Sequence, residues 1–203
     1  MSETMRPIIL FLFFLLPSIS QAKTILVLGD SLSAGYGVEL KDGWVNLLRE
    51  RLNEQGEYTV VNASISGNTT SMGLARIPSL LKKYEPNIVI IELGGNDGLQ
   101  GHPVKVLERN LSKMTELSKA SGAKVLLVGI QIPPNYGARY TDEFFATFPK
   151  VAKEHSVPLV PFILDNVATN PELMQRDGVH PKAEAQPQIL ENIWPYFEQL
   201  IQQ

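Results

Sequence analysis

The sequence contains no cysteine and only three histidines among its 203 residues. Without cysteine, disulfide bonds, thiolate metal sites and cysteine nucleophiles are all excluded. The three histidines, His102, His155 and His180, are scattered along the chain, and neither a phosphate-binding Gly-Lys loop nor a His-Glu-x-x-His helix is present. We therefore predict that the protein uses neither a metal ion nor another cofactor.

A strong charge of either sign is also lacking, since 18 Lys and Arg residues face 21 Asp and Glu residues. Nucleic-acid binding requires a basic surface for the phosphates, so the net charge of −3 gives no reason to expect such a partner. Hydrophobic residues make up 44% of the chain, which is typical of a globular protein. The length is sufficient for one domain with a substantial core.

The N-terminal apolar run, residues 8–16, is shorter than the roughly 20 residues that a membrane-spanning helix needs. Arg6 precedes it, and a small-x-small cleavage sequence, Ser-Gln-Ala, follows it. This layout predicts a secretory signal peptide over 1–22, a mature domain over 23–203, and a periplasmic or secreted location. A retained N-terminal anchor is the alternative, and a start at Met5 would give a more usual short leader.

Short apolar runs separated by helical patterns fill the rest of the chain. Continuous rather than alternating hydrophobicity is typical of strands buried on both faces. Such runs occur at 24–28, 58–62, 88–93 and 124–128, with a weaker one at 158–162. Apolar residues at helical spacing occur at 44–52, 74–81, 107–117 and 189–200. The alternation predicts an α/β fold of three layers, α/β/α, with a flavodoxin-like central parallel sheet of about five strands.

Two prolines and one loop are expected to interrupt the regular alternation of strands and helices. We expect Pro78 to interrupt the helix around 74–81, and Pro195 to kink or restart the last helix. The longest irregular stretch, 131–139, is expected to form either a mobile loop over a site or a long connection.

Polar and glycine residues follow the first three predicted strands. Ser31 follows the first strand, Gly67 the second and Asn96 the third. In a parallel sheet the carboxyl ends of the strands meet at one edge, where ligands bind. We therefore expect these three residues to lie at one site, with Ser31 in a glycine-rich turn.

His180 lies three residues after Asp177, across a glycine and before the last helix. This spacing allows the carboxylate to bond one ring nitrogen while the other faces a nucleophile. We predict Ser31 as nucleophile, His180 as base and Asp177 as the residue that orients it. His102 and His155 are expected to be surface residues.

Acyl transfer also requires hydrogen-bond donors where negative charge develops on the carbonyl oxygen. The backbone N–H groups of Ser31 and Gly67 and the side-chain amide of Asn96 are the candidates. Each of these residues alone is commonly found in turns, so the prediction depends on their combination.

Four sequence blocks together resemble the SGNH hydrolases, also called the GDSL family. The blocks are Gly29-Asp30-Ser31-Leu32-Ser33, Gly67, Gly94-Gly95-Asn96-Asp97 and Asp177-x-x-His180. The resemblance implies the same nucleophile, base, orienting acid and oxyanion donors. It covers the predicted mature chain, with one departure: Asn68 stands where the family commonly has Asp.

The expected substrate is a small acyl ester, a thioester or a lysophospholipid. A set of apolar residues could supply a groove for the acyl chain: Leu99, Ile130, Ile132, Pro133, Pro134 and Tyr136. The alternatives are a carbohydrate acetylesterase of the same superfamily, a non-catalytic acyl or lipid carrier, and a flavodoxin-like cofactor protein. We expect a monomer with at most transient contact with membrane lipid.

Overall fold

The computed structural model describes residues 22–53 and 58–202. The predicted signal peptide, apart from Ala22, lies outside these residues. The first strand begins at Lys23, where the predicted mature chain starts. Among the described residues, no helix combines the length and the apolar character needed to cross a membrane.

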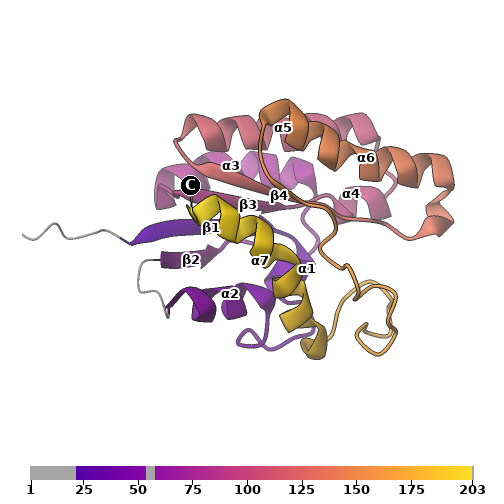
Figure 1. Cartoon of the computed structure of the whole chain (residues 1–203). Helices are drawn as coiled ribbons and strands as arrows, with labels where there is room; N and C mark the ends of the chain where they lie inside the picture. Colours follow the sequence, from indigo (N-terminus) through magenta and orange to yellow (C-terminus); the bar gives the residue numbers. More distant parts are fainter. Residues whose placement is uncertain (1–21, 54–57, 203) are drawn as a thin grey trace, which may run out of the picture.

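A five-stranded parallel sheet forms the centre of the domain (Figure 1). Its strands are β1 (Lys23–Gly29), β2 (Tyr58–Asn62), β3 (Ile88–Glu92), β4 (Lys124–Val128) and β5 (Leu159–Val160). The spatial order is β2-β1-β3-β4-β5, and every neighbouring pair is parallel. All five residues of β3 are buried, as the continuous apolar run predicts for a central strand.

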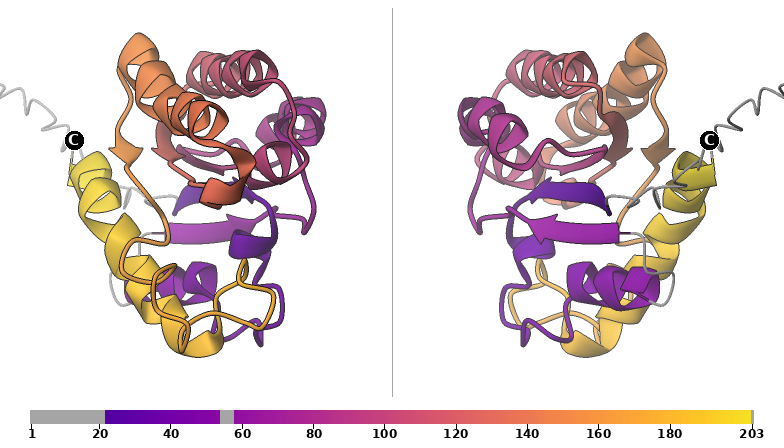
Figure 2. Two further views of the ribbon diagram at one scale, coloured as in Figure 1. Left: turned by 90° about the vertical axis from the view of Figure 1, so that its right-hand side faces the viewer. Right: turned by 90° about the vertical axis from the view of Figure 1, so that its left-hand side faces the viewer.

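Helices cover both faces of this sheet, so the predicted three-layer α/β/α architecture is confirmed (Figures 1 and 2). The α-helices of the described residues are α1 (Ser31–Ala34), α2 (Trp44–Asn53), α3 (Thr70–Tyr84), α4 (Gly95–Leu99), α5 (Val104–Ala120), α6 (Ala138–His155) and α7 (Gln186–Gln202). Helices α3, α5 and α6 pack on one face, and α2 and α7 pack on the other. Four aromatic residues from these helices are fully buried: Trp44, Phe144, Phe148 and Phe197.

The predicted interruption at Pro78 is wrong, because α3 runs without a break from Thr70 to Tyr84. The predicted restart at Pro195 is equally wrong, because α7 continues through it. Both proline rings lie on exposed helix faces, where water can reach the carbonyl group that loses its hydrogen bond. Packing of the apolar face therefore outweighs the missing hydrogen bond.

Two segments of the structure differ from what the sequence predicts. The fifth strand has two residues instead of five, because Pro158 and Pro161 flank it and cannot donate to the ladder. The stretch 131–139 is less irregular than expected: a 3-10 helix, Pro134–Tyr136, lies within it, and α6 begins at Ala138.

Candidate active site

The chain reverses its strand order between β1 and β3, which is where parallel α/β sheets bind ligands. Ser31 lies two residues after the end of β1 and is the first residue of α1, a single helical turn that ends at Gly35. Asp30 caps this turn, because its Oδ1 accepts a hydrogen bond of 3.1 Å from the Leu32 N–H. The cap fixes the direction in which the Ser31 side chain leaves the sheet.

Ser31, His180 and Asp177 form a continuous row of hydrogen bonds. His180 Nε2 lies 2.9 Å from Ser31 Oγ, and His180 Nδ1 lies 2.7 Å from Asp177 Oδ2. Ser31 and His180 are half-buried. The structure thus brings together three residues that lie up to 149 positions apart in the sequence.

Asp177 is held by backbone donors as well as by the histidine ring. Its Oδ1 accepts hydrogen bonds from the N–H groups of Val179 at 2.9 Å and His180 at 3.0 Å. Burial alone would raise the pKa of Asp177, but these bonds and the imidazole lower it to about 2. The carboxylate is therefore ionised near neutral pH and orients Nδ1 as a donor.

Asn96 lies in α4, the helix that follows β3, and its side-chain amide already has two acceptors. Nδ2 donates to Asp30 Oδ2 at 3.1 Å and to the backbone carbonyl of Asn68 at 3.0 Å. Gly67 precedes Asn68 in an exposed turn with a φ of 80°, a conformation that favours glycine. The turn that carries Gly67 is thereby tied to Asn96.

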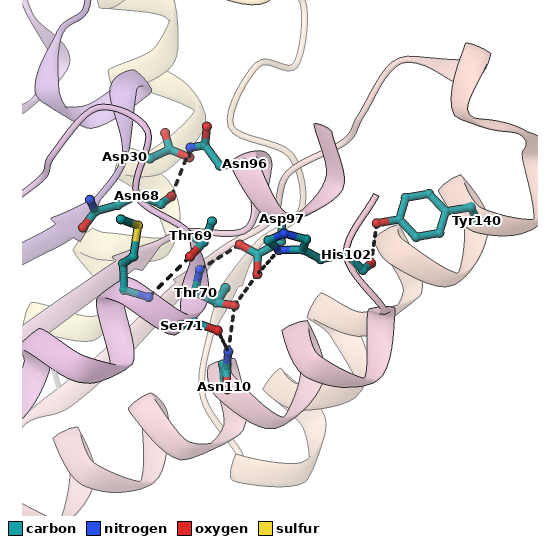
Figure 3. A network of polar contacts seen from close by, with 11 residues as sticks. Asp30, Asn68, Thr69, Thr70, Ser71, Asn96, Asp97, His102, Asn110 and Tyr140 are labelled. Atoms are coloured by element: carbon teal, nitrogen blue, oxygen red, sulfur yellow. Dashed lines mark hydrogen bonds and ion pairs between the residues drawn. The ribbon is translucent and has the colours of Figure 1, made fainter. Parts of the chain in front are cut away.

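A buried network behind Asn96 was missed by the sequence reasoning (Figure 3). Asp97 accepts from the Thr70 N–H at 2.7 Å and from the Thr70 hydroxyl at 2.6 Å. Asn110 donates to the same hydroxyl at 3.1 Å. Because Thr70 begins α3 just beyond Gly67, this network fixes α4 against the turn that carries Gly67.

Two buried carboxyl groups lie beneath Ser31. Glu92 ends β3, and its Oε2 accepts from the Ser33 hydroxyl at 2.6 Å and from the Asp30 N–H at 3.4 Å. Burial raises the pKa of Asp30 to about 6, and burial together with the Asp30 charge raises the pKa of Glu92 well above its usual range. Glu92 therefore binds its proton more tightly than an exposed glutamate does.

A pocket of about 390 Å³ opens beside the Ser31 hydroxyl and the His180 ring. Five of the six apolar residues expected to form a groove line it: Leu99, Ile130, Ile132, Pro133 and Pro134. Tyr136 instead donates its hydroxyl to the Leu99 carbonyl at 2.9 Å. The sequence reasoning missed further apolar lining residues that come from the segments before His180: Phe162, Leu164, Ala168, Met174 and Val179.

The other two histidines lie outside this row of hydrogen bonds. His102 Nδ1 lies 3.8 Å from Asp97 Oδ1. His155, the last residue of α6, has its Nε2 2.6 Å from the hydroxyl of Ser112 on α5. Both are half-buried rather than freely exposed. In the part of the chain that the structure describes, no group of three His, Asp or Glu side chains is arranged to hold a metal ion.

A Ser–His–Asp row at the carboxyl edge of a parallel sheet, next to an apolar pocket, defines the class of the serine hydrolases. Comparison with known proteins gives the particular family. Residues 27–186 match the GDSL-like lipase/acylhydrolase family, and the chain belongs to it.

The sequence similarity to known proteins extends over most of the chain. An arylesterase of Vibrio mimicus is 54% identical over 92% of this chain and 94% of its own. Thioesterase 1/protease 1/lysophospholipase L1 of Escherichia coli K12 is 48% identical over 89% of this chain and 86% of its own. A solved structure of the esterase EstA from Pseudoalteromonas sp., inhibited by monoethylphosphonate, is 41% identical with a TM-score of 0.85, covering 89% of this chain and 100% of that one.

Proposed function

We propose that the protein is a serine hydrolase that cleaves esters and thioesters of acyl substrates through an acyl-enzyme on Ser31. The observation that carries this proposal is the 2.9 Å contact between Ser31 Oγ and His180 Nε2, with Asp177 on the far ring nitrogen. The names of the relatives, arylesterase and thioesterase among them, support the same reaction class.

In the first half of the reaction, Ser31 Oγ attacks the acyl carbon while its proton passes to His180 Nε2. The imidazolium then gives this proton to the departing alkoxide or thiolate, which leaves as an alcohol or thiol. In the second half, water attacks the acyl-enzyme and its proton passes to His180. The imidazolium then gives this proton to Ser31 Oγ as the acid leaves. Asp177 keeps Nδ1 protonated throughout, so that Nε2 is the nitrogen that accepts.

The developing oxyanion needs donors, and we propose the N–H groups of Ser31 and Gly67 and the amide of Asn96 for this role. In the structure both Asn96 contacts are with neighbouring protein oxygens. Asn96 must therefore redirect one N–H from Asp30 or Asn68 toward the oxyanion as negative charge develops there. The charge of the oxyanion favours exchange with the neutral backbone carbonyl of Asn68, since hydrogen bonds to ionised acceptors are about twice as strong.

The pocket favours a fatty acyl group over a small acetyl group carried by a sugar. Its lining next to Ser31 is largely aliphatic, with residues such as Ile132, Leu164 and Val179. Burial of methylene groups stabilises a bound chain by about 0.8 kcal/mol each. The proposed substrates are thus lysophospholipids and other acyl esters or thioesters.

We further propose that residues 1–22 direct the protein to the periplasm or outside the cell, where it acts as a monomer with transient contact with membrane lipid. The apolar run over 8–16 and the small residues after it support export. N-terminal sequencing of the exported protein would show Lys23 first, and an intact leader would contradict cleavage.

The function is tested with nitrophenyl esters of increasing chain length and with palmitoyl-CoA, comparing the mature chain with Ser31→Ala. We expect Ser31→Ala to reduce turnover by on the order of 10⁶-fold, as for other serine nucleophiles. Ser79→Ala, which removes an exposed hydroxyl on α3, is the matched control and should behave as wild type. Equal rates for Ser31→Ala and wild type would contradict the mechanism. A preference for acetyl esters would instead favour a carbohydrate acetylesterase, and tight acyl binding without turnover a lipid carrier.

A further inference from the structure

The segments that carry Ser31 and His180 meet at the side chain of Gln175. Its Nε2 donates to the backbone carbonyl of Tyr36 at 2.8 Å and to that of Pro181 at 2.9 Å. The Gln175 backbone N–H donates to the carbonyl of His180 itself at 2.7 Å. The side-chain amide of Gln175 therefore donates one hydrogen bond to the segment that carries Ser31 and one to the segment that carries His180.

Tyr36 connects this junction to the nucleophile. Its N–H donates to the Ser31 carbonyl at 3.0 Å, and its carbonyl accepts from Gln175. The Tyr36 ring also packs on the His180 ring, with a centroid distance of 4.5 Å. An unbroken chain of hydrogen bonds therefore runs from Ser31 through Tyr36 and Gln175 to the backbone of His180.

Gly37 allows the Gln175 amide to approach this closely. An added Cβ on Gly37 would lie 2.5 Å from Gln175 Oε1 and 2.7 Å from Nε2. The backbone of Gly37 also has a φ of 72°, which favours glycine. Gln175 is half-buried at this junction, so its amide is partly shielded from water.

We propose that Gln175 is a positioning residue that sets the distance between Ser31 Oγ and His180 Nε2 by joining the two segments that carry them. The proposal rests on the assignment of Ser31 and His180 as nucleophile and base. Proton transfer over 2.9 Å depends steeply on distance, and a displacement of about 1 Å can cost 10²-fold in rate. Loss of the junction should therefore slow the attack of Ser31 more than it weakens substrate binding.

The first test compares Gln175→Met with Gln188→Met. Methionine keeps the length of the side chain and removes both amide donors. Gln188 is also half-buried but lies on α7, where it donates to Asn192. We expect Gln175→Met to lower kcat by about 10- to 100-fold with KM within about twofold, while Gln188→Met keeps the wild-type kcat.

A second measurement separates positioning from a loss of stability. The rate at which a monoethylphosphonate ester modifies Ser31 reports the nucleophile and base without the later steps. It should fall in Gln175→Met by the same factor as kcat. In a His180→Ala background, Gln175→Met should cost no further activity, because the base that it positions is gone.

Gly37→Ala tests the same junction without changing a polar group. Gly35→Ala is its matched control, since Gly35 has a similar φ of 76° but an added Cβ there meets no atom within 4 Å. The two variants share the backbone strain, and only Gly37→Ala pushes the Gln175 amide away. We expect the larger loss of kcat in Gly37→Ala.

The outcomes distinguish this proposal from the one on which it rests. Activity retained in Ser31→Ala would overturn both. An inactive Ser31→Ala together with a wild-type kcat and modification rate in Gln175→Met would overturn the role of Gln175 alone. A full additional loss from Gln175→Met in the His180→Ala background would also overturn it, because the effect would then not act through the base.

Discussion

Arg76 donates a hydrogen bond of 2.9 Å from Nη1 to Oδ1 of Asn68, the residue at which the sequence departs from the expected pattern. Arg76 also donates from Nη2 to the carbonyl of Ala63 at 2.6 Å, so it ties α3 to the turn after β2. Asn68 is buried, and only its backbone carbonyl contacts Asn96. The Asn68 side chain therefore has a structural partner that is separate from the proposed oxyanion donors.

Asn68→Asp should turn this contact into an ion pair. We expect it to raise the free energy of unfolding by roughly 1 kcal/mol at neutral pH and to leave kcat within about twofold of wild type. Asn68→Ala is the counterpart: it leaves Arg76 without this acceptor and should cost about 1–2 kcal/mol. Denaturant unfolding and ester hydrolysis of the three proteins measure both effects. A large drop in kcat for Asn68→Asp would show that the side chain acts on catalysis.

The buried pair of Asp30 and Glu92 predicts a dependence of stability on pH. The pKa of Glu92 is raised above its ordinary 4.5 and that of Asp30 to about 6. A carboxyl group with a raised pKa binds its proton more tightly in the folded state. It therefore stabilises the fold most at low pH, and this stability is lost as pH rises from the unfolded to the folded pKa.

Glu92→Gln removes one of these two titrations. The amide keeps an acceptor for Ser33 and Asp30, although the Glu92 Oε1 position has no hydrogen-bond partner among the described residues. We expect the variant to be less stable than wild type near pH 4. This difference in stability should shrink as pH rises. Melting temperatures from pH 4 to 9 measure this, with Glu184→Gln, an exposed glutamate, as the control. A difference in melting temperature between variant and wild type that stays constant from pH 4 to 9 would contradict the raised pKa of Glu92.

The sheet could be predicted from the sequence because its strands are short apolar runs, and burial on both faces leaves few other structures for them. Ser31, Gly67 and Asn96 were predictable for the same reason, since each follows a strand whose end is fixed by the sheet. The predicted interruption at Pro78 and restart at Pro195 were wrong because local backbone preference says nothing about which helix face meets solvent. Both prolines lie on exposed faces.

The side chains that support the site were less predictable, because each contact joins distant segments. Gln175 meets Tyr36 across 139 positions, and Thr70 meets Asp97 across 27. Neither pair leaves a local pattern in a single sequence. Asp97 gave a partial signal, because it stands beside Asn96 in the Gly94-Gly95-Asn96-Asp97 block.

The pocket predicts that chain-length preference can be changed without affecting the reacting groups. Ala168 lines the pocket and is exposed, so a larger side chain there does not disturb the core. We expect Ala168→Trp to lower kcat/KM for long-chain nitrophenyl esters at least about tenfold more than for the acetyl ester. Ala75→Trp, on an exposed part of α3, is the control. An equal loss for all chain lengths would show that the acyl chain lies elsewhere.

Asp177 should contribute both to activity and to acid stability, and the two effects have different origins. Its pKa is lowered to about 2 from an ordinary 3.8, so its hydrogen bonds stabilise the folded state above about pH 4. This contribution is lost as pH falls from about 4 to about 2, because the carboxylate is then protonated. The stability difference between wild type and Asp177→Asn should therefore be largest above pH 4 and shrink toward pH 2.

The activity of Asp177→Asn should fall by up to about 10⁴-fold at every pH where wild type is active, as when the corresponding acid of other triads is replaced. The reason is the proton on the ring: an asparagine amide donates to Nδ1, which leaves Nε2 protonated and unable to accept the Ser31 proton. Asp142→Asn makes the same charge change on α6, at an exposed position. If both variants lost activity equally, the effect would be one of net charge. A loss confined to Asp177→Asn would instead follow from its 2.7 Å contact with Nδ1.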